Sequence, residues 1–193
     1  MNLRMSVPIA LVIAAAVSIS AIRVLAQVPP SSPAAEVARA EQAMNALQQS
    51  LIARLRAAME QGGPSAAVSV CHDEAVAIAD RVAREQGIAL GRTSLKLRNP
   101  ANAPRAWARP HVERAAGTKA AAERLHVVDL GDRVGVLRPI GTIDMCLQCH
   151  GDPDIVREKI GPALAATYPK DQATGFAAGD LRGWMWAEVP KAK

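Results

Sequence analysis

The sequence predicts an α+β domain in which a long helical segment precedes a set of strands. Residues from about 34 to 87 are rich in Ala, Glu, Arg, Gln and Leu, and their apolar residues recur at three- and four-residue steps. Both features are typical of helices that pack on a core. After Gly87 the pattern changes to short apolar runs separated by turn-forming residues, which predict strands.

The first 26 residues have the composition of a signal peptide. Arg4 precedes an almost wholly apolar run over 7–22, and Val24-Leu25-Ala26 offers small residues where a signal peptidase would cleave. An uncleaved membrane anchor is the alternative, because the run is near the lower length limit for a membrane span. Either way, residues 27–193 are expected to form a single domain in the periplasm or another extracytoplasmic compartment. Only this N-terminal segment would meet the membrane.

Two helices are predicted within the helical segment. The first covers about 34–61 and ends at Gly62-Gly63-Pro64. The second covers 65–86, and Gly87 provides its C-terminal stop. Cys71 falls in the middle of the apolar stripe of this second helix, so its side chain is expected to face inward.

The remainder of the chain is predicted to alternate strands with short helices. Gly131-Asp132 separates two apolar runs and predicts a hairpin turn. The expected strands cover 93–98, 125–130 and 134–137, the expected helices cover about 105–116 and 155–164, and a last apolar stretch covers 184–189.

Composition argues against a nucleic-acid-binding protein. The net charge of +5 falls to +3 when residues 1–26 are removed with Arg4 and Arg23, and no dense stripe of Lys and Arg is present. Half of the residues are apolar, yet the chain contains only one Phe, one Tyr and three Trp. Aromatic side chains usually supply much of the bulk of a core, so a bound macrocycle would supply bulk that this chain lacks.

Cys146-Leu147-Gln148-Cys149-His150 has the C-x-x-C-H pattern of haem attachment. Two thiols at this spacing can form thioethers with the two vinyl groups of one haem, and the adjacent imidazole can bind the iron. A redox-active disulfide and half of a zinc site are the alternatives, but the first expects a βαβ context and the second a further ligand pair. The motif therefore predicts one covalent haem c with His150 as its proximal ligand.

The second axial position of the iron has several candidates. Cys71 faces the core on its helix, and iron ligation would protect the thiol that an odd cysteine count leaves over. A plain buried thiol is the alternative for this residue. Met145 lies beside the attachment sequence, on the proximal side. The other candidates are His72, His111 and His126, or an open position that holds water or a gas.

Short motifs flank the attachment sequence. Arg92-Thr93-Ser94, Arg98-Asn99-Pro100-Ala101-Asn102 and Pro139-Ile140 precede it, and Tyr168-Pro169-x-Asp171-x-Ala173-x-Gly175 and Gly179-Asp180-x-Arg182-Gly183 follow it. In this order, and with Cys71 upstream, the chain resembles a family of haem-c-binding proteins with a PAS-like fold. This family was long classed as a domain of unknown function. The resemblance covers roughly residues 40–189.

The resemblance implies an antiparallel sheet flanked by helices, after a long N-terminal helical segment. It also implies an axial pair of His150 and Cys71, which agrees with the inward position expected for Cys71. Arg92, Lys96 and Arg98 would lie on or near one strand, where they either contact the haem propionates or form a solvated strand edge. Members of the family occur as exported single-haem cytochromes and as the sensor domains of receptors.

The sequence thus predicts an exported cytochrome that exchanges electrons with redox partner proteins or reports redox state. The alternative is a haem sensor of redox state or of a small gas (nitric oxide, carbon monoxide or oxygen) that works through a partner protein. A non-enzymatic role is expected. A peroxidase-type enzyme is the third alternative and ranks last, because no distal His and Arg occur at a recognisable spacing.

Overall fold

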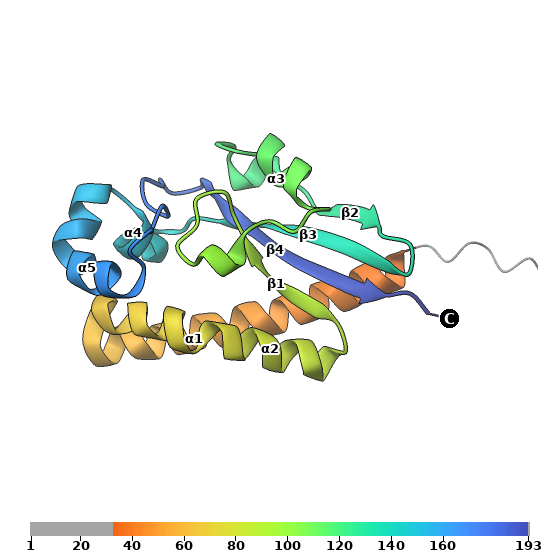
Figure 1. Ribbon diagram of the computed structural model, residues 1–193, viewed down its shortest axis with the longest axis horizontal. Coiled ribbons are helices and arrows are strands. Elements are labelled where there is room, and N and C mark those ends of the chain that lie inside the picture. Colours follow the sequence, from red (N-terminus) through yellow and green to blue (C-terminus); the bar gives the residue numbers. More distant parts are fainter. Residues whose placement is uncertain (1–32, 193) are drawn as a thin grey trace, which may run out of the picture. The chain divides into compact units, whose positions relative to one another are not determined.

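The computed structural model describes residues 33–192, in which a four-stranded sheet carries helices on both faces (Figure 1). All strands pair antiparallel in the order β1-β4-β3-β2. The predicted α+β class is confirmed. The predicted signal peptide, residues 1–26, lies outside the described residues. The strands are β1 (Ala89–Thr93), β2 (His126–Asp129), β3 (Arg133–Gly141) and β4 (Leu181–Pro190).

The long helix α1 (Ala34–Asp73) is interrupted where the sequence predicted the end of the first helix. Gly62 and Gly63 have non-helical backbone angles, and Gly63 has a φ of 65°, which side-chain-bearing residues rarely adopt. The chain reverses at this point, so that the second half of α1 and the following helix α2 (Ala75–Gln86) return alongside the first half (Figure 1). The two glycines therefore create a helical hairpin.

The predicted helix over 65–86 is broken once more, at Glu74. This residue separates the end of α1 from α2, with backbone angles of φ −108° and ψ −27°. Its carboxylate accepts hydrogen bonds of 2.6 and 2.7 Å from Arg54 in the first half of α1. The ion pair fixes the break at Glu74 to the first half of α1. It thereby holds in place the last turn of α1, which contains Cys71.

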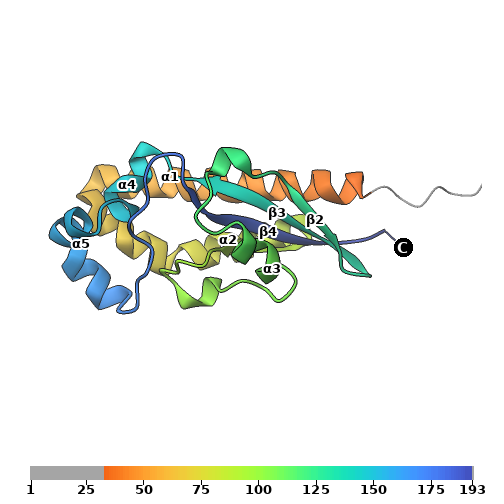
Figure 2. The same ribbon diagram turned by 90° about the horizontal axis from the view of Figure 1, so that it is seen from above.

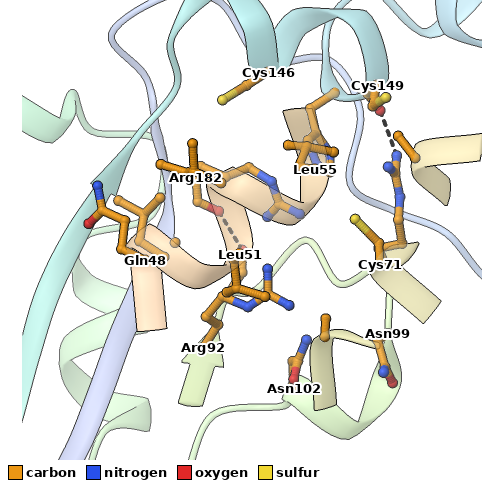
Figure 3. A pocket seen from close by; sticks show the side chains of 18 of the residues that line it. Gln48, Leu51, Leu55, Cys71, Arg92, Asn99, Asn102, Cys146, Cys149 and Arg182 are labelled. Atoms are coloured by element: carbon orange, nitrogen blue, oxygen red, sulfur yellow. Dashed lines mark hydrogen bonds between the residues drawn. The ribbon is translucent and has the colours of Figure 1, made fainter. Parts of the chain in front are cut away.

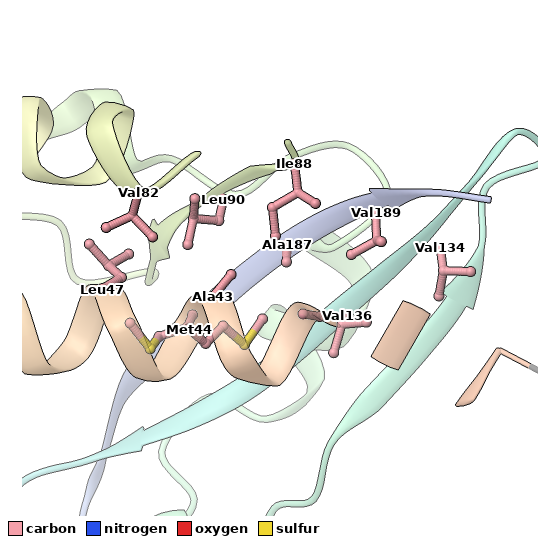
Figure 4. Packing of buried hydrophobic residues seen from close by; sticks show 12 residues of the cluster. Ala43, Met44, Leu47, Val82, Ile88, Leu90, Val134, Val136, Ala187 and Val189 are labelled. Atoms are coloured by element: carbon pink, nitrogen blue, oxygen red, sulfur yellow. The ribbon is translucent and has the colours of Figure 1, made fainter. Parts of the chain in front are cut away.

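The two faces of the sheet pack against different helices. Along β4, Met185, Ala187 and Val189 face α1 and α2, whereas Trp184 faces α3 (Arg109–Arg114). This alternation follows from the two-residue period of a strand. The core on the helical-hairpin side is shown in Figure 4, and its other members are Ala40, Ala43, Met44, Leu47, Val82, Ile88, Leu90, Val134 and Val136.

The strand predicted over 93–98 is wrong. Pairing between β1 and β4 ends at Thr93 opposite Trp184. At the next position Gly183 comes so close that a Cβ there would lie 2.4 Å from the carbonyl oxygen of Thr93. The chain then leaves the sheet, and residues 94–98 form a loop although their polar and apolar side chains alternate. Arg92 therefore lies on β1, whereas Lys96 and Arg98 lie on the loop that follows.

The remaining elements lie near their predicted positions, and the hairpin turn at Gly131-Asp132 is confirmed. The attachment motif itself forms a helix, α4 (Asp144–His150), which was not predicted because its seven residues are too few to show a period. Figure 2 shows α4 and α5 (Pro153–Thr167) together at the end of the sheet where α1 reverses. No helix within residues 33–192 has the length and apolar character needed to cross a bilayer.

Candidate cofactor site

A cavity of about 380 Å³ lies between the helical hairpin and one end of the sheet. Its walls come from both halves of α1, the end of β1 with its following loop, the end of β3 with α4, and the start of β4. Cofactor sites typically have volumes of roughly 300–1,000 Å³. The cavity is lined by the predicted attachment cysteines and proximal histidine, by the favoured second ligand and by the three predicted propionate contacts, namely Cys146, Cys149, His150, Cys71, Arg92, Lys96 and Arg98. Figure 3 labels Cys71, Arg92, Cys146 and Cys149 among them.

Helix α4 carries the attachment motif along the wall of the cavity. The helix ends at His150 because Gly151 turns the chain there, and a Cβ at Gly151 would lie 2.5 Å from the carbonyl oxygen of Leu147. Cys149 packs against the apolar cluster that joins α5 to the second half of α1. Burial raises the pKa of the Cys149 thiol; the charge of Arg98 partly offsets this, and Cys71 and Cys146 add to it. All three cysteines are free of disulfide bonds.

His150 is oriented by the backbone of a distant loop. Its Nδ1 lies 2.6 Å from the carbonyl oxygen of Ala173. Because a carbonyl oxygen only accepts, Nδ1 carries the proton, and Nε2 keeps the lone pair that can bind a metal ion. Burial, together with the charges of Arg182 and Arg98, lowers the pKa of His150 to about 2. The imidazole is therefore neutral near pH 7, as a metal ligand must be.

The cavity contains more cations than anions. Arg98 forms an ion pair with Asp171 at 2.9 Å, but among the described residues no carboxylate pairs with Arg92 or Arg182. Nε of Arg182 is buried without a hydrogen-bond partner. Burial, together with the charges of Arg98 and Arg92, lowers the pKa of Arg182 to about 10. Nη1 of Arg182 donates to the carbonyl oxygen of Lys96 at 3.4 Å, so the unmet needs of this guanidinium are a partner for Nε and a counter-charge. Both indicate a ligand with an anionic group.

The structure separates the candidates for the second axial ligand. Cys71 lines the cavity, and Figure 3 shows its sulfur directed into the space that α4 borders. His72 has a side chain 48% exposed and bonds Asp73 through Nδ1 at 2.7 Å, outside the cavity lining. Met145 lines the cavity from α4, the same helix that carries the predicted proximal ligand, His150.

His111 and His126 lie on the other face of the sheet, between α3 and β2. Their rings stack with centroids 3.9 Å apart, and the ring of His111 meets Trp184 edge-on at 4.8 Å. Burial lowers the pKa of both histidines, and the charge of Arg114 adds to this effect. The pair contributes to packing beneath α3 rather than to the cavity.

We expect this stacked pair to make the fold sensitive to acid. Because folding lowers both pKa values, the stabilising contribution is complete above the ordinary value of 6.5 and is lost as pH falls through the lower folded-state values. Urea titrations from about pH 8 to about pH 5 should therefore give a falling free energy of unfolding. His126→Gln should weaken this decrease, whereas the exposed His72→Gln should preserve it. The same pH slope for His126→Gln and wild type would contradict the prediction.

Two residues of the site were missed by sequence reasoning, Asp171 and Arg182. Both lie in motifs that carried the family resemblance, but neither was assigned a role there. Arg182 had a usable signal, because it is the one basic residue in the mostly apolar stretch 181–189. Asp171 had none, because its partner Arg98 is remote in the sequence and meets it only in the fold.

Fold and cavity together define a class of protein, an α+β domain that holds a cofactor cavity lined by cysteine and histidine between a helical hairpin and a sheet. The sequence profile of the family described as Tll0287-like (Tll0287) matches residues 31–190, and the chain belongs to this family. A similar solved structure is the crystal structure of the cyanobacterial heme-protein Tll0287. It superimposes with a TM-score of 0.63 at 25% sequence identity, over 82% of this chain and 97% of that chain. No curated protein matches the chain. The family resemblance predicted from the motifs is confirmed.

Proposed function

We propose that the protein is an exported single-haem c-type cytochrome, in which Cys146 and Cys149 hold haem c through thioethers and His150 and Cys71 are the axial ligands. The observation that carries this proposal is the cavity that collects all three cysteines with a neutral, oriented imidazole. Attachment needs two of the thiols, and the third approaches from a separate helix. Membership of the family, with a heme-protein among its solved structures, supports haem as the ligand.

The residues of the cavity fit this group chemically. Leu51, Leu55 and Val68 present apolar surface to a macrocycle, and the cationic side of the cavity suits its two carboxylates. When bound, haem iron supplies one-electron chemistry between the ferric and ferrous states. His150 would offer Nε2 to the metal, and a Cys71 thiolate would favour the ferric state.

We assign the propionates to Arg92 and Arg182. Of the side chains that the sequence proposed for this role, Arg98 is already paired with Asp171. Lys96 is exposed, and its Nζ donates to the carbonyl oxygen of Thr174 at 3.2 Å. Arg92 and Arg182 keep donors that no carboxylate in the described residues satisfies, and an Arg fork matches a carboxylate in geometry.

Arg182→Gln should lower the reduction potential. A buried cation favours the ferrous state because that state carries less positive charge, so its removal should favour the ferric state about tenfold, or about 59 mV for one electron. Spectroelectrochemical titration measures the shift. Arg157→Gln is the control, because Arg157 is exposed on α5. An unchanged potential in an Arg182→Gln protein with full haem content would contradict the assignment.

The partners that follow are redox proteins of the same extracytoplasmic compartment. Two filled axial positions leave no place for a substrate on the iron, so we propose electron transfer or redox reporting rather than enzymatic turnover. Nucleic acid has no part in this function. The membrane enters only if the N-terminal segment remains as an anchor.

A haem-based sensor of redox state or of a small gas, acting through a partner protein, is the second candidate. The position of Cys71 favours it, because this residue lies in the last turn of α1, just before the break at Glu74. A ligand at a helix end can leave the iron when only a few residues move.

Optical spectra of the purified protein test both candidates. It should be made in a host that matures c-type cytochromes and recorded oxidised, reduced, and reduced under carbon monoxide. A carrier keeps a six-coordinate low-spin spectrum in both states and ignores carbon monoxide. A sensor changes ligation on reduction and then binds the gas. A colourless protein would exclude both.

A further inference from the structure

We propose that Asp171 and Arg98 are the positioning residues of the proximal ligand. They hold the peptide of Ala173, whose carbonyl oxygen in turn holds the imidazole of His150. This inference rests on the proposed function, because it concerns the ligand set of the same site.

The loop between α5 and β4 lies against the end of α4 through backbone hydrogen bonds. The N–H of Gly175 donates to the carbonyl oxygen of Gly151 at 2.7 Å, and the N–H of Phe176 donates to that of His150 at 3.0 Å. The loop therefore holds His150 by its main chain as well as by its side chain. What holds the part of the loop around Ala173 then also determines the orientation of the imidazole.

A single carboxylate organises the part of the loop that contacts the imidazole. Oδ1 of Asp171 accepts the N–H of Ala173 at 2.8 Å. Oδ2 of Asp171 accepts from Nε and Nη2 of Arg98 at 3.1 and 2.9 Å. Ala173 is fully buried, so its peptide has no water to replace a lost partner.

Arg98, Asp171, Ala173 and His150 are linked by these hydrogen bonds into a circuit, which Arg98 connects back to α4. Its Nη2 also donates to the carbonyl oxygen of Cys149 at 2.6 Å, a contact drawn as a dashed line in Figure 3. The side chains of Arg98 and Asp171 are each only 10% exposed, where charge-assisted hydrogen bonds are strong. One guanidinium thus links the carboxylate to the residue that precedes the ligand.

The circuit has a chemical consequence for His150. A firm bond from Nδ1–H to the Ala173 carbonyl oxygen fixes the ring orientation and makes Nε2 a stronger donor. A stronger donor stabilises the ferric state. Loss of such an outer partner typically weakens a metal ligand by about 10–100-fold. Arg98 therefore acts on the iron through His150 rather than by contacting a propionate.

Three variants of the holoprotein test this role. Asp171→Ala removes both interactions of the carboxylate. Asp171→Asn keeps an oxygen for the Ala173 N–H but loses the charge that pairs with Arg98. The matched control is Asp180→Ala, because Asp180 lies on the same loop and also accepts a backbone N–H, that of Ala177, and pairs with a cation, but contacts none of the circuit.

The reduction potential and the ferric electron paramagnetic resonance spectrum are the readouts, with intact mass to count the haem. Asp171→Ala should favour the ferrous state about tenfold, which is about 59 mV upward, and should broaden the ferric signal. The potential and spectrum of Asp171→Asn should lie closer to those of the wild type, and those of Asp180→Ala should equal the wild-type values. A merely structural role would change stability without moving the potential.

The outcomes separate this inference from the proposed function. Wild-type potential and spectrum in haem-loaded Asp171→Ala would overturn the positioning role and leave haem attachment intact. A wild-type protein at bare-polypeptide mass would overturn both. If Asp171→Ala does not accumulate, Arg98→Lys replaces it, because it keeps the charge and loses the fork. An unchanged potential in Arg98→Lys would then overturn the inference.

Discussion

Replacing Cys146 and Cys149 together by alanine should abolish covalent attachment completely. Thioethers to these two thiols are the bonds that would keep the macrocycle on the denatured chain, because both side chains line the cavity from one short helix. Protein from a host that matures c-type cytochromes should therefore show the added mass of one haem in the wild type and none in the double variant. Extraction with acidified acetone should remove colour only from the variant.

The control for this experiment is Cys71→Ala. Cys71 belongs to α1 and is not part of the attachment motif, so its loss should leave the haem covalently bound. Either single replacement in the motif should leave one thioether and a reduced haem content. Covalent haem in the double variant would refute the assigned bonds, and an absence of haem in the wild type would refute the proposed function.

The second large effect is expected from Cys71→Ser. A thiolate donates more electron density to iron than a hydroxyl group, so its loss should destabilise the ferric state. Axial ligands set haem potentials over a range of about 0.8 V, and we expect an upward shift on the order of a hundred millivolts. The ferric optical spectrum should change at the same time, because one of the two strong ligands is gone.

The neighbouring histidine provides the matched control for the thiolate. His72→Ala changes the next residue of the same helix turn, but its side chain is half exposed and bonds Asp73. Its spectrum and potential should match those of the wild type. An unchanged ferric spectrum in Cys71→Ser would remove Cys71 from the iron. A changed spectrum in His72→Ala alone would assign the position to the histidine.

The helical part of the fold was predictable because its signals are local. Gly62-Gly63-Pro64 ends one helix, Gly87 ends another, and the apolar stripe through Cys71 makes that residue face inward. Each of these follows from the helical period or from the backbone limits of glycine and proline. The inward position of Cys71 is confirmed by its place in the cavity wall.

The strand after Gly87 was placed too late because its limits are not local. Residues 94–98 alternate like a strand, but the close approach of Gly183 to Thr93 ends the ladder before them. The circuit through Asp171 and Arg98 was beyond prediction for the same reason. Tertiary contacts between remote segments determine both, and no periodicity within one segment records them.

Because α1 reverses at Gly62 and Gly63, the two proposed iron ligands are held in place in different ways. His150 is adjacent to a thiol that would be bonded to the macrocycle, so it stays close even in a denatured chain. Cys71 arrives only when the returning arm of the hairpin docks. Partial unfolding of that arm would therefore exchange one ligand and spare the other. The visible absorption spectrum of the protein would then report whether the second half of α1 is docked.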